Sequence, residues 1–175
     1  MKRKFSARHL ALLALLSALA VVGRILMVPL PNIQPITVLV IIITLTMSVW
    51  DGLAVATVSL VISNVFLGMG PWTLFQLLSY AAIVLLTRLL MTHWYQSKQQ
   101  KSRFLIALWA GICGLLYGIF ISGWNVWFYH MPSFFGYYVV GVPFDLAHAA
   151  GNIVFYLLLE PTLAPIIHQR YPYYR

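Results

Sequence analysis

The 175-residue chain is 62% hydrophobic and only 8% charged, whereas about a quarter of the residues in ordinary soluble domains are charged. A soluble domain of this size could not cover so much apolar surface, but lipid can solvate it, so the composition excludes a soluble globular fold. The net charge of +8 lies in short segments between apolar runs, which favours the positive-inside pattern of membrane proteins over a nucleic-acid-binding surface.

The apolar runs predict an all-α membrane bundle with about six transmembrane helices in a single domain, residues 1–175. Crossing the hydrocarbon takes about 20 apolar residues with their backbone bonds satisfied inside the segment. In chain order, the expected helices are 9–28, 36–50, 53–67, 72–93, 104–128 and 142–167.

The breaks between these runs are marked by prolines, glycines and polar residues. The first run is too long for the core of a signal peptide, and it ends at Pro29 and Pro31. Asp51-Gly52 is expected to end the second helix, with Asp51 capping the third. The second and third runs are short, so either could be tilted, kinked or incompletely spanning.

Lysine and arginine predict the orientation. With the N-terminus inside, ten of the eleven basic residues fall on the cytoplasmic side, and only Arg24 lies near the outer face. The inner set is Lys2, Arg3, Lys4, Arg8, Arg88, Lys98, Lys101, Arg103, Arg170 and Arg175.

The connections on the outer side, 29–35, 68–71 and 129–141, are bordered by aromatic and amide side chains, so recognition chemistry is expected there. These candidates for contact with a ligand are Asn32, Gln34, Trp72, Thr73, Gln76, Trp124, Asn125, Trp127, Tyr137 and Tyr138.

Asp145, His148 and Asn152 have i, i+3, i+7 spacing and share one helix face. Such a stripe faces the bundle interior or a water-filled cavity. It would either contact a ligand or form an internal hydrogen-bond network. For Asp145, contact with a ligand is the favoured alternative, because this residue is nearest the outer mouth.

Thr73, Gln76 and Tyr80 repeat this spacing where the fourth helix begins, after Gly70-Pro71. The helix N-terminus offers unpaired N–H groups to a ligand, while interfacial anchoring and packing are the alternative. Asn64 could face the same cavity.

Arg24 is costly at this depth unless it is paired or hydrated. Pairing with Asp145 is the structural expectation, and binding an anionic or amide-rich ligand is the alternative. The third acid, Glu160, is expected to snorkel or to contact a partner.

The chain lacks enzyme motifs. There is no His-Glu-x-x-His, Gly-x-Ser-x-Gly or P-loop pattern, and Cys113 stands alone in an apolar run. We therefore expect no catalysis, no metal, no catalytic cofactor and no ATP hydrolysis by the chain itself.

Small residues form a stripe on the first helix. Ala7, Ala11, Ala14 and Ala18 lie on a single helical face, and Ala14 and Ala18 have the small-xxx-small spacing that lets another helix approach closely. The stripe would dock a partner or pack within its own bundle.

Over its full length the chain resembles the substrate-binding (S) components of energy-coupling factor transporters, the bacterial vitamin importers. The resemblance is in the number of helices, the inside termini and the Ala-x-x-x-Ala face. Segments 31–37, Pro-Asn-Ile-Gln-Pro-Ile-Thr, and 68–76, Gly-Met-Gly-Pro-Trp-Thr-Leu-Phe-Gln, resemble the cobalamin-linked subgroup.

The resemblance implies a multi-pass protein of the bacterial plasma membrane that binds a vitamin outside, with cobalamin as the first candidate. It implies docking through Ala11, Ala14 and Ala18 to a transmembrane coupling subunit that works with two ATPases. An S component for another vitamin or micronutrient, and a membrane scaffold without a transport role, are the alternatives.

Overall fold

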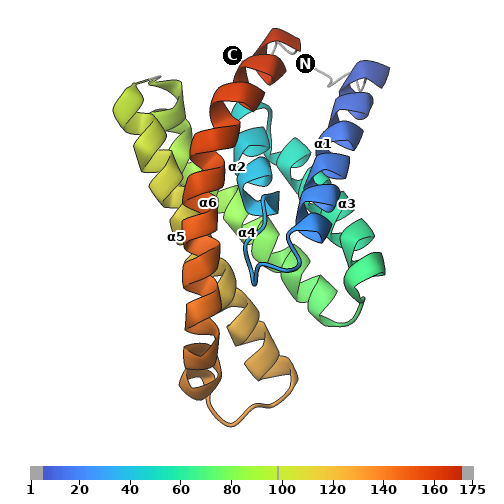
Figure 1. The fold of residues 1–175 in the computed structure, drawn as a ribbon, viewed down its shortest axis with the longest axis vertical. Coiled ribbons are helices and arrows are strands. Elements are labelled where there is room, and N and C mark those ends of the chain that lie inside the picture. The colour runs from blue at the N-terminus through green and yellow to red at the C-terminus, as the bar shows by residue number, and fades with distance from the viewer. Residues whose placement is uncertain (1–5, 98, 171–175) are drawn as a thin grey trace.

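The computed structural model describes residues 6–97 and 99–170, and these residues form six α-helices and no strand (Figure 1). Lys2, Arg3, Lys4, Lys98 and Arg175, which supported the predicted orientation, lie outside the described residues. The helices are α1 (Ala7–Leu26), α2 (Ile36–Thr46), α3 (Val49–Leu67), α4 (Trp72–Gln96), α5 (Gln100–Phe128) and α6 (Phe134–Arg170).

Five of these helices, α1, α3, α4, α5 and α6, are long and apolar enough to cross a membrane. The sixth, α2, has 11 residues and spans about 16 Å, whereas the hydrocarbon core is about 30 Å thick. The fold class is confirmed, but the expectation of six spanning helices is corrected to five spanning helices and one short one.

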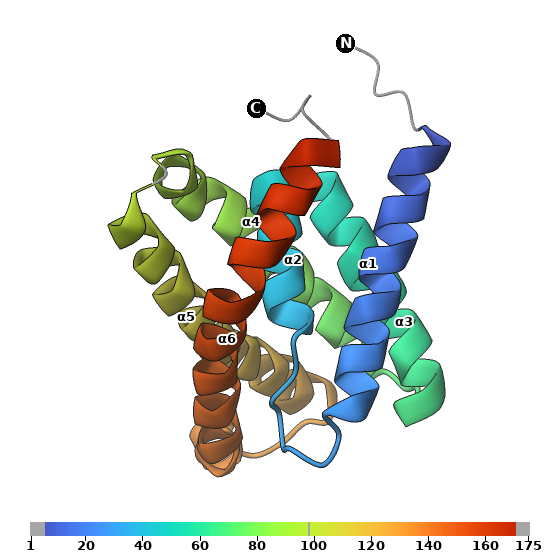
Figure 2. The same ribbon diagram turned by 45° about the horizontal axis from the view of Figure 1, so that its top comes forward.

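The short helix α2 lies at the centre of the bundle. It packs against each of the other five helices, and all of its side chains are buried. In both views it lies between α1 and α6 (Figures 1 and 2). Its sequence is mostly β-branched, which usually favours a strand. A helix forms because a buried strand here would leave its backbone groups unpaired.

The chain nevertheless returns through the bundle between α1 and α3. Near the start of both helices, His9 Nε2 lies 2.9 Å from Asp51 Oδ1. Near their other ends, Arg24 Nη1 donates to Asn64 Oδ1 at 2.8 Å. The two helices therefore run in the same direction, and segment 27–35 together with α2 makes the return. Non-helical backbone is tolerated at such depth where protein covers it or where it lines a cavity.

The bundle thus has two distinct ends. The basic end is where α1 begins and α6 finishes, and it includes the α4–α5 connection (Figure 2). The loop end carries the connections 27–35, 68–71 and 129–133.

The break between α2 and α3 lies at Met47 and Ser48, not at Asp51-Gly52 as predicted. Ser48 is the N-cap of α3: its Oγ accepts from Asp51 N at 3.2 Å and donates to Asp51 Oδ2 at 2.6 Å. This reciprocal pairing resembles a capping box and keeps Asp51 inside the first turn. Gly52 is helical as well, and it lets α3 pack closely on α2, because a side chain there would overlap Thr44 of α2.

Helix α6 begins at Phe134, so residues 134–141 are helical and not part of a loop as predicted. It contains Pro143, Pro161 and Pro165. Proline cannot donate to the carbonyl four residues earlier, and in the case of Pro161 that carbonyl belongs to Leu157. Arg103 Nη2 of α5 donates to this carbonyl instead. Its Nε also lies 3.3 Å from Glu160 Oε2, so Arg103 joins α5 to the proline-interrupted turn of α6.

Helices α5 and α6 approach closely along a glycine stripe. A Cβ on Gly114 would lie 2.8 Å from the backbone N of Ala149, and one on Gly111 would lie 2.9 Å from the Ile153 side chain. Gly118, one turn further along, faces Asp145. The glycines therefore set the separation of the two helices beside the loop end.

Candidate functional site

Two adjoining cavities lie at the loop end, with volumes of about 210 and 470 Å³. Asn32 and Tyr117 line both cavities, so these side chains stand where the two spaces meet. The smaller one is lined by Arg24, Met27, Val28, Leu30, Asn32, Ile33, Gln34, Leu67, Gln76 and Tyr117. The larger one is lined by Asn32, Tyr117, Gly118, Ile121, Ser122, Gly136, Tyr137, Val140, Gly141, Phe144 and Asp145.

Arg24 is held at the wall of the smaller cavity by neutral oxygens. Its Nε donates to Gln34 Oε1 at 3.1 Å, and its Nη1 donates to Ser63 Oγ at 2.5 Å and to Asn64 Oδ1 at 2.8 Å. Its Nη2 makes no hydrogen bond with the described residues. The guanidinium is therefore oriented while keeping donor capacity for a ligand.

The expected Arg24–Asp145 ion pair is wrong. The hydrogen-bond partners of Arg24 come from the loop and from α3, and within residues 6–97 and 99–170 no ion pair joins it to Asp145. The two charges instead line adjoining cavities.

Asn64 extends the Arg24 network to α4. Its Nδ2 donates to Thr73 Oγ1 at 2.9 Å and to Gln76 Oε1 at 2.7 Å. Asn64 and Thr73 are buried behind the wall, whereas Gln76 lines the smaller cavity. Asn64 and Thr73 therefore position Arg24 and Gln76 and do not line the space themselves.

Asp145 is buried, with 5% of its surface exposed, and its Oδ2 has no hydrogen-bond partner among the described residues. It lines the larger cavity. Gly118 on α5 leaves room for its carboxyl group, because a Cβ at position 118 would overlap both carboxylate oxygens. An unsatisfied carboxylate at this depth is costly, which is why such groups are typically functional.

The loop 27–35 forms the shared wall. Asn32 adopts a left-handed conformation, with φ 61°, which asparagine tolerates better than most residues. Its Nδ2 donates to the Phe144 carbonyl of α6 at 3.2 Å. Together with the Gln34–Arg24 bond, this contact ties the loop to both α1 and α6.

A buried layer lies beneath the cavities. Thr37 Oγ1 of α2 is hydrogen-bonded to Tyr80 Oη at 2.9 Å and to His148 Nε2 at 3.0 Å. The ring of Tyr117 packs edge-on against Tyr80 and His148, at centroid distances of 5.4 and 5.5 Å. Tyr80 and His148 therefore support Tyr117 from within the bundle and do not line the cavities, which corresponds to the packing and hydrogen-bond alternatives considered for them.

The residues of the α6 polar stripe therefore divide between the two predicted roles, contact with a ligand and an internal hydrogen-bond network. Asp145 faces the larger cavity, whereas His148 bonds within the buried layer and Asn152 donates to the Ala110 carbonyl of α5 at 3.1 Å.

Several aromatic candidates lie away from the cavities. Trp72 is exposed, Tyr138 stacks on Phe134 at 5.6 Å, and Trp124 stacks on Phe75 at 5.8 Å. Trp124 and Trp127 line a separate, open apolar groove. Asn125 does not line the cavities either, but it donates to Tyr137 Oη at 3.1 Å, and Tyr137 lines the larger cavity.

Sequence reasoning missed Tyr117, Gly118 and Ser122, which line the larger cavity from α5. The available signal was the spacing of Gly111, Gly114 and Gly118 on one helix face. That spacing predicts close approach to another helix and hence the interior side of α5.

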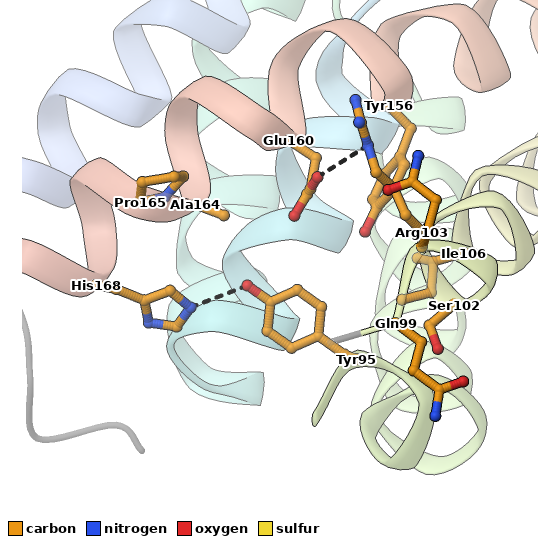
Figure 3. A pocket seen from close by; sticks show the side chains of 11 residues that line it. Tyr95, Gln99, Ser102, Arg103, Ile106, Tyr156, Glu160, Ala164, Pro165 and His168 are labelled. Carbon is orange, nitrogen blue, oxygen red and sulfur yellow. Dashed lines mark hydrogen bonds and ion pairs between the residues drawn. The ribbon is translucent and has the colours of Figure 1, made fainter. Parts of the chain in front are cut away.

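A further cavity of about 390 Å³ lies at the basic end, between α4, α5 and α6 (Figure 3). Its polar side chains pair with one another: Arg103 with Glu160, and Tyr95 Oη with His168 Nε2 at 3.0 Å. Glu160, expected to snorkel or meet a partner, contacts Arg103 within the chain. These pairs cross-link the helices at the basic end.

The alanine stripe of α1 faces away from the bundle. Ala7, Ala11, Ala14 and Ala18 are all exposed, and the buried face carries His9, Leu16, Ser17, Ala20 and Val21. The alternative that the stripe packs within its own bundle is therefore wrong.

Among the described residues, no group of three or more His, Cys, Asp or Glu side chains is arranged to hold a metal ion. The apolar helices, the polar cavities at one end and the outward small-residue face define an integral-membrane helical bundle with a solute-sized internal site.

The family model of the ECF transporter substrate-specific component matches residues 8–160. The chain belongs to this family. Membership makes it a multi-pass, substrate-binding transport component, and it implies association with the coupling subunit and ATPases of an ECF transporter. No curated protein and no solved structure matches the chain.

Proposed function

We propose that this chain captures a vitamin in the two adjoining cavities of the loop end. The observation that carries the proposal is a pair of polar groups there, Arg24 Nη2 and Asp145 Oδ2, that have no hydrogen-bond partner within residues 6–97 and 99–170. Asn32, Gln34 and Gln76 add amide groups, and Tyr117 and Tyr137 add aromatic surface. Apolar walls with a few placed polar groups are typical of small-molecule sites.

We also propose that the loop end faces outward and that the membrane is the bacterial plasma membrane. Arg8, Lys101 and Arg103 all lie on helix segments near the basic end, whereas Arg24 lies at the loop end. Since lysine and arginine are concentrated on the cytoplasmic side of membrane proteins, the basic end is the cytoplasmic one.

Delivery of the vitamin is proposed to depend on docking through α1. Ala11, Ala14 and Ala18 leave a shallow exposed strip along this helix, where a helix of the coupling subunit can approach closely. The ATPases of the complex then supply the energy, since the chain carries no nucleotide-binding motif.

Cobalamin is the first candidate because segments 31–37 and 68–76 resemble the cobalamin-linked subgroup. A corrinoid is larger than the combined cavities, so it would extend beyond them. A smaller vitamin is the second candidate, because cavities of about 210 and 470 Å³ suit ligands of ordinary drug size.

The test is calorimetric titration of the purified protein in nanodiscs with thiamine, riboflavin, pyridoxamine, biotin, pantothenate, niacin, folate and cyanocobalamin. We expect tight binding of one vitamin, and we expect Gln76→Ala to weaken it. The matched control is Gln100→Ala, at the opposite end of the bundle. Background heats for the whole panel, from protein that unfolds cooperatively, would refute vitamin capture.

A further inference from the structure

The larger cavity contains a carboxylate, Asp145, that no charge in the described part of the chain neutralises. Asp145 is 5% exposed, its Oδ2 has no partner, and no ion pair joins it to another described residue. A buried carboxylate without a partner is expensive in an apolar bundle, and an opposite charge placed against it removes much of that cost. The structure therefore has a position that favours a cation.

The surroundings of Asp145 leave space for such a group. Gly118 accommodates the carboxyl group where any larger residue would overlap it, and the Gly141 Cβ position is 4.0 Å from Asp145 Oδ2. Both glycines line the larger cavity, as does Ser122. The carboxylate therefore borders open volume beside positions 118 and 141, where the two helices carry no side chain.

The opposite charge lies on the other side of the shared wall. Arg24 lines the smaller cavity, and its Nη2 is not hydrogen-bonded within the described part of the chain. Gln34, Ser63 and Asn64 hold the rest of the guanidinium in place. Because neutral oxygens satisfy its other donors, Arg24 can accept an electronegative ligand group without losing an ion pair.

We infer that the substrate is a bipolar vitamin, with a positively charged nitrogen that binds Asp145 in the larger cavity and an electronegative group that binds Arg24 Nη2 in the smaller one. Asn32 and Tyr117, which line both spaces, contact the middle of the ligand. This inference rests on the proposed function and narrows its substrate class.

The charge arrangement also predicts what the site rejects. A vitamin with an anionic group and no cationic nitrogen would leave Asp145 unsatisfied while adding negative charge to the cavity. Pantothenate and biotin belong to that class. Cyanocobalamin also lacks a protonated nitrogen, so the inference favours the second candidate of the proposed function, a smaller vitamin, over cobalamin. Thiamine and pyridoxamine carry the required positive charge.

The experiment measures vitamin binding by the wild type and two charge-matched variants, Asp145→Asn and Glu160→Gln. Both variants remove one intramembrane carboxylate, but Glu160 faces Arg103 at the basic end. The strongest binder in the panel above is expected to carry a cationic nitrogen. Asp145→Asn should weaken it by about 10- to 100-fold, the range of a charge-assisted hydrogen bond. Glu160→Gln should leave its affinity within about twofold of wild type, as expected for a distant independent site.

Two outcomes overturn the inference while sustaining vitamin capture: tight binding of only neutral or anionic vitamins, or wild-type affinity in Asp145→Asn. Absence of binding across the panel overturns the proposed function itself. If Asp145→Asn does not fold, Gly118→Ala provides the second test, because it displaces the carboxylate without removing it. The Gly118→Ala protein should bind the strongest binder of the panel more weakly than the Gly123→Ala protein does, and equal affinities of the two variants would overturn the inference.

Discussion

Replacing Gly118 with alanine tests the placement of the Asp145 carboxylate beside α5. The new Cβ would overlap both carboxylate oxygens, whereas a Cβ on Gly123 of the same helix would meet no atom within 4 Å. Alanine is intrinsically favoured over glycine in a helix by about 1 kcal/mol. Gly123→Ala is therefore expected to be neutral or to stabilise the protein by up to about 1 kcal/mol.

At Gly118 the same gain is opposed by overpacking, which costs about 1–3 kcal/mol. Gly118→Ala is thus expected to be about 1–3 kcal/mol less stable than Gly123→Ala. Unfolding by SDS titration in mixed micelles, followed by the fluorescence of the six tryptophans, measures this difference.

The double variant Gly118→Ala/Asp145→Ala separates the contact from other effects. Truncating Asp145 removes the obstructing carboxylate, so the cost of Gly118→Ala should largely disappear in that background, with a coupling of about 1 kcal/mol or more. Equal stability of the Gly118 and Gly123 variants, with no coupling to Asp145, would refute the packing argument.

Three further predictions concern other parts of the molecule. Arg103→Gln should destabilise the protein by about 1–3 kcal/mol in the same SDS titration. The loss should be smaller in a Pro161→Ala background, because residue 161 then regains an N–H for the Leu157 carbonyl. An equal loss in both backgrounds would contradict the role given to Arg103. Asn32→Gly keeps the left-handed backbone but loses the hydrogen bond to Phe144. Release of the bound vitamin, measured by stopped flow, should therefore be roughly fivefold faster, which corresponds to about 1 kcal/mol. Asn32→Ala adds backbone strain and should release the vitamin faster still, whereas unchanged rates would show that this bond does not retain the ligand. Ala14→Leu should reduce copurification with the coupling subunit while sparing vitamin binding, unlike the lipid-facing control Leu108→Trp, and loss of binding alone would place the alanine stripe outside docking.

The membrane class and the helical bundle could be predicted from composition, because no soluble arrangement hides so much apolar surface. The length of the second helix could not. Hydropathy measures apolar character but does not distinguish a side chain that faces lipid from one that faces other helices, and α2 faces only helices. Asp51 was misplaced as a helix breaker because Ser48, three residues earlier, satisfies its backbone N–H.

The candidate site was predicted from three features: the outer connections with Asn32, Gln34 and Gln76, the lone outer basic residue Arg24, and Asp145 of the α6 polar stripe. The partners of these residues could not be predicted, because two charges at similar depth need not be adjacent in the bundle. Arg24 instead contacts Asn64 across α1 and α3. His148 could not be distinguished from Asp145 by spacing alone; the hydrogen bond between His148 and Thr37 places it in the buried layer.

The shortness of α2 has a consequence for how the protein is made. An 11-residue helix cannot bridge the hydrocarbon, so moving by itself from the translocation machinery into the bilayer, without its neighbouring helices, lowers its free energy little. Its stability in the bilayer depends on α3 through α6, all of which are synthesised later. The 27–46 segment is therefore expected to reach its final position late, after helices that follow it in the chain have inserted. Ribosome-bound chains that end before α5 should accordingly leave this segment accessible to water-soluble thiol reagents at an introduced cysteine.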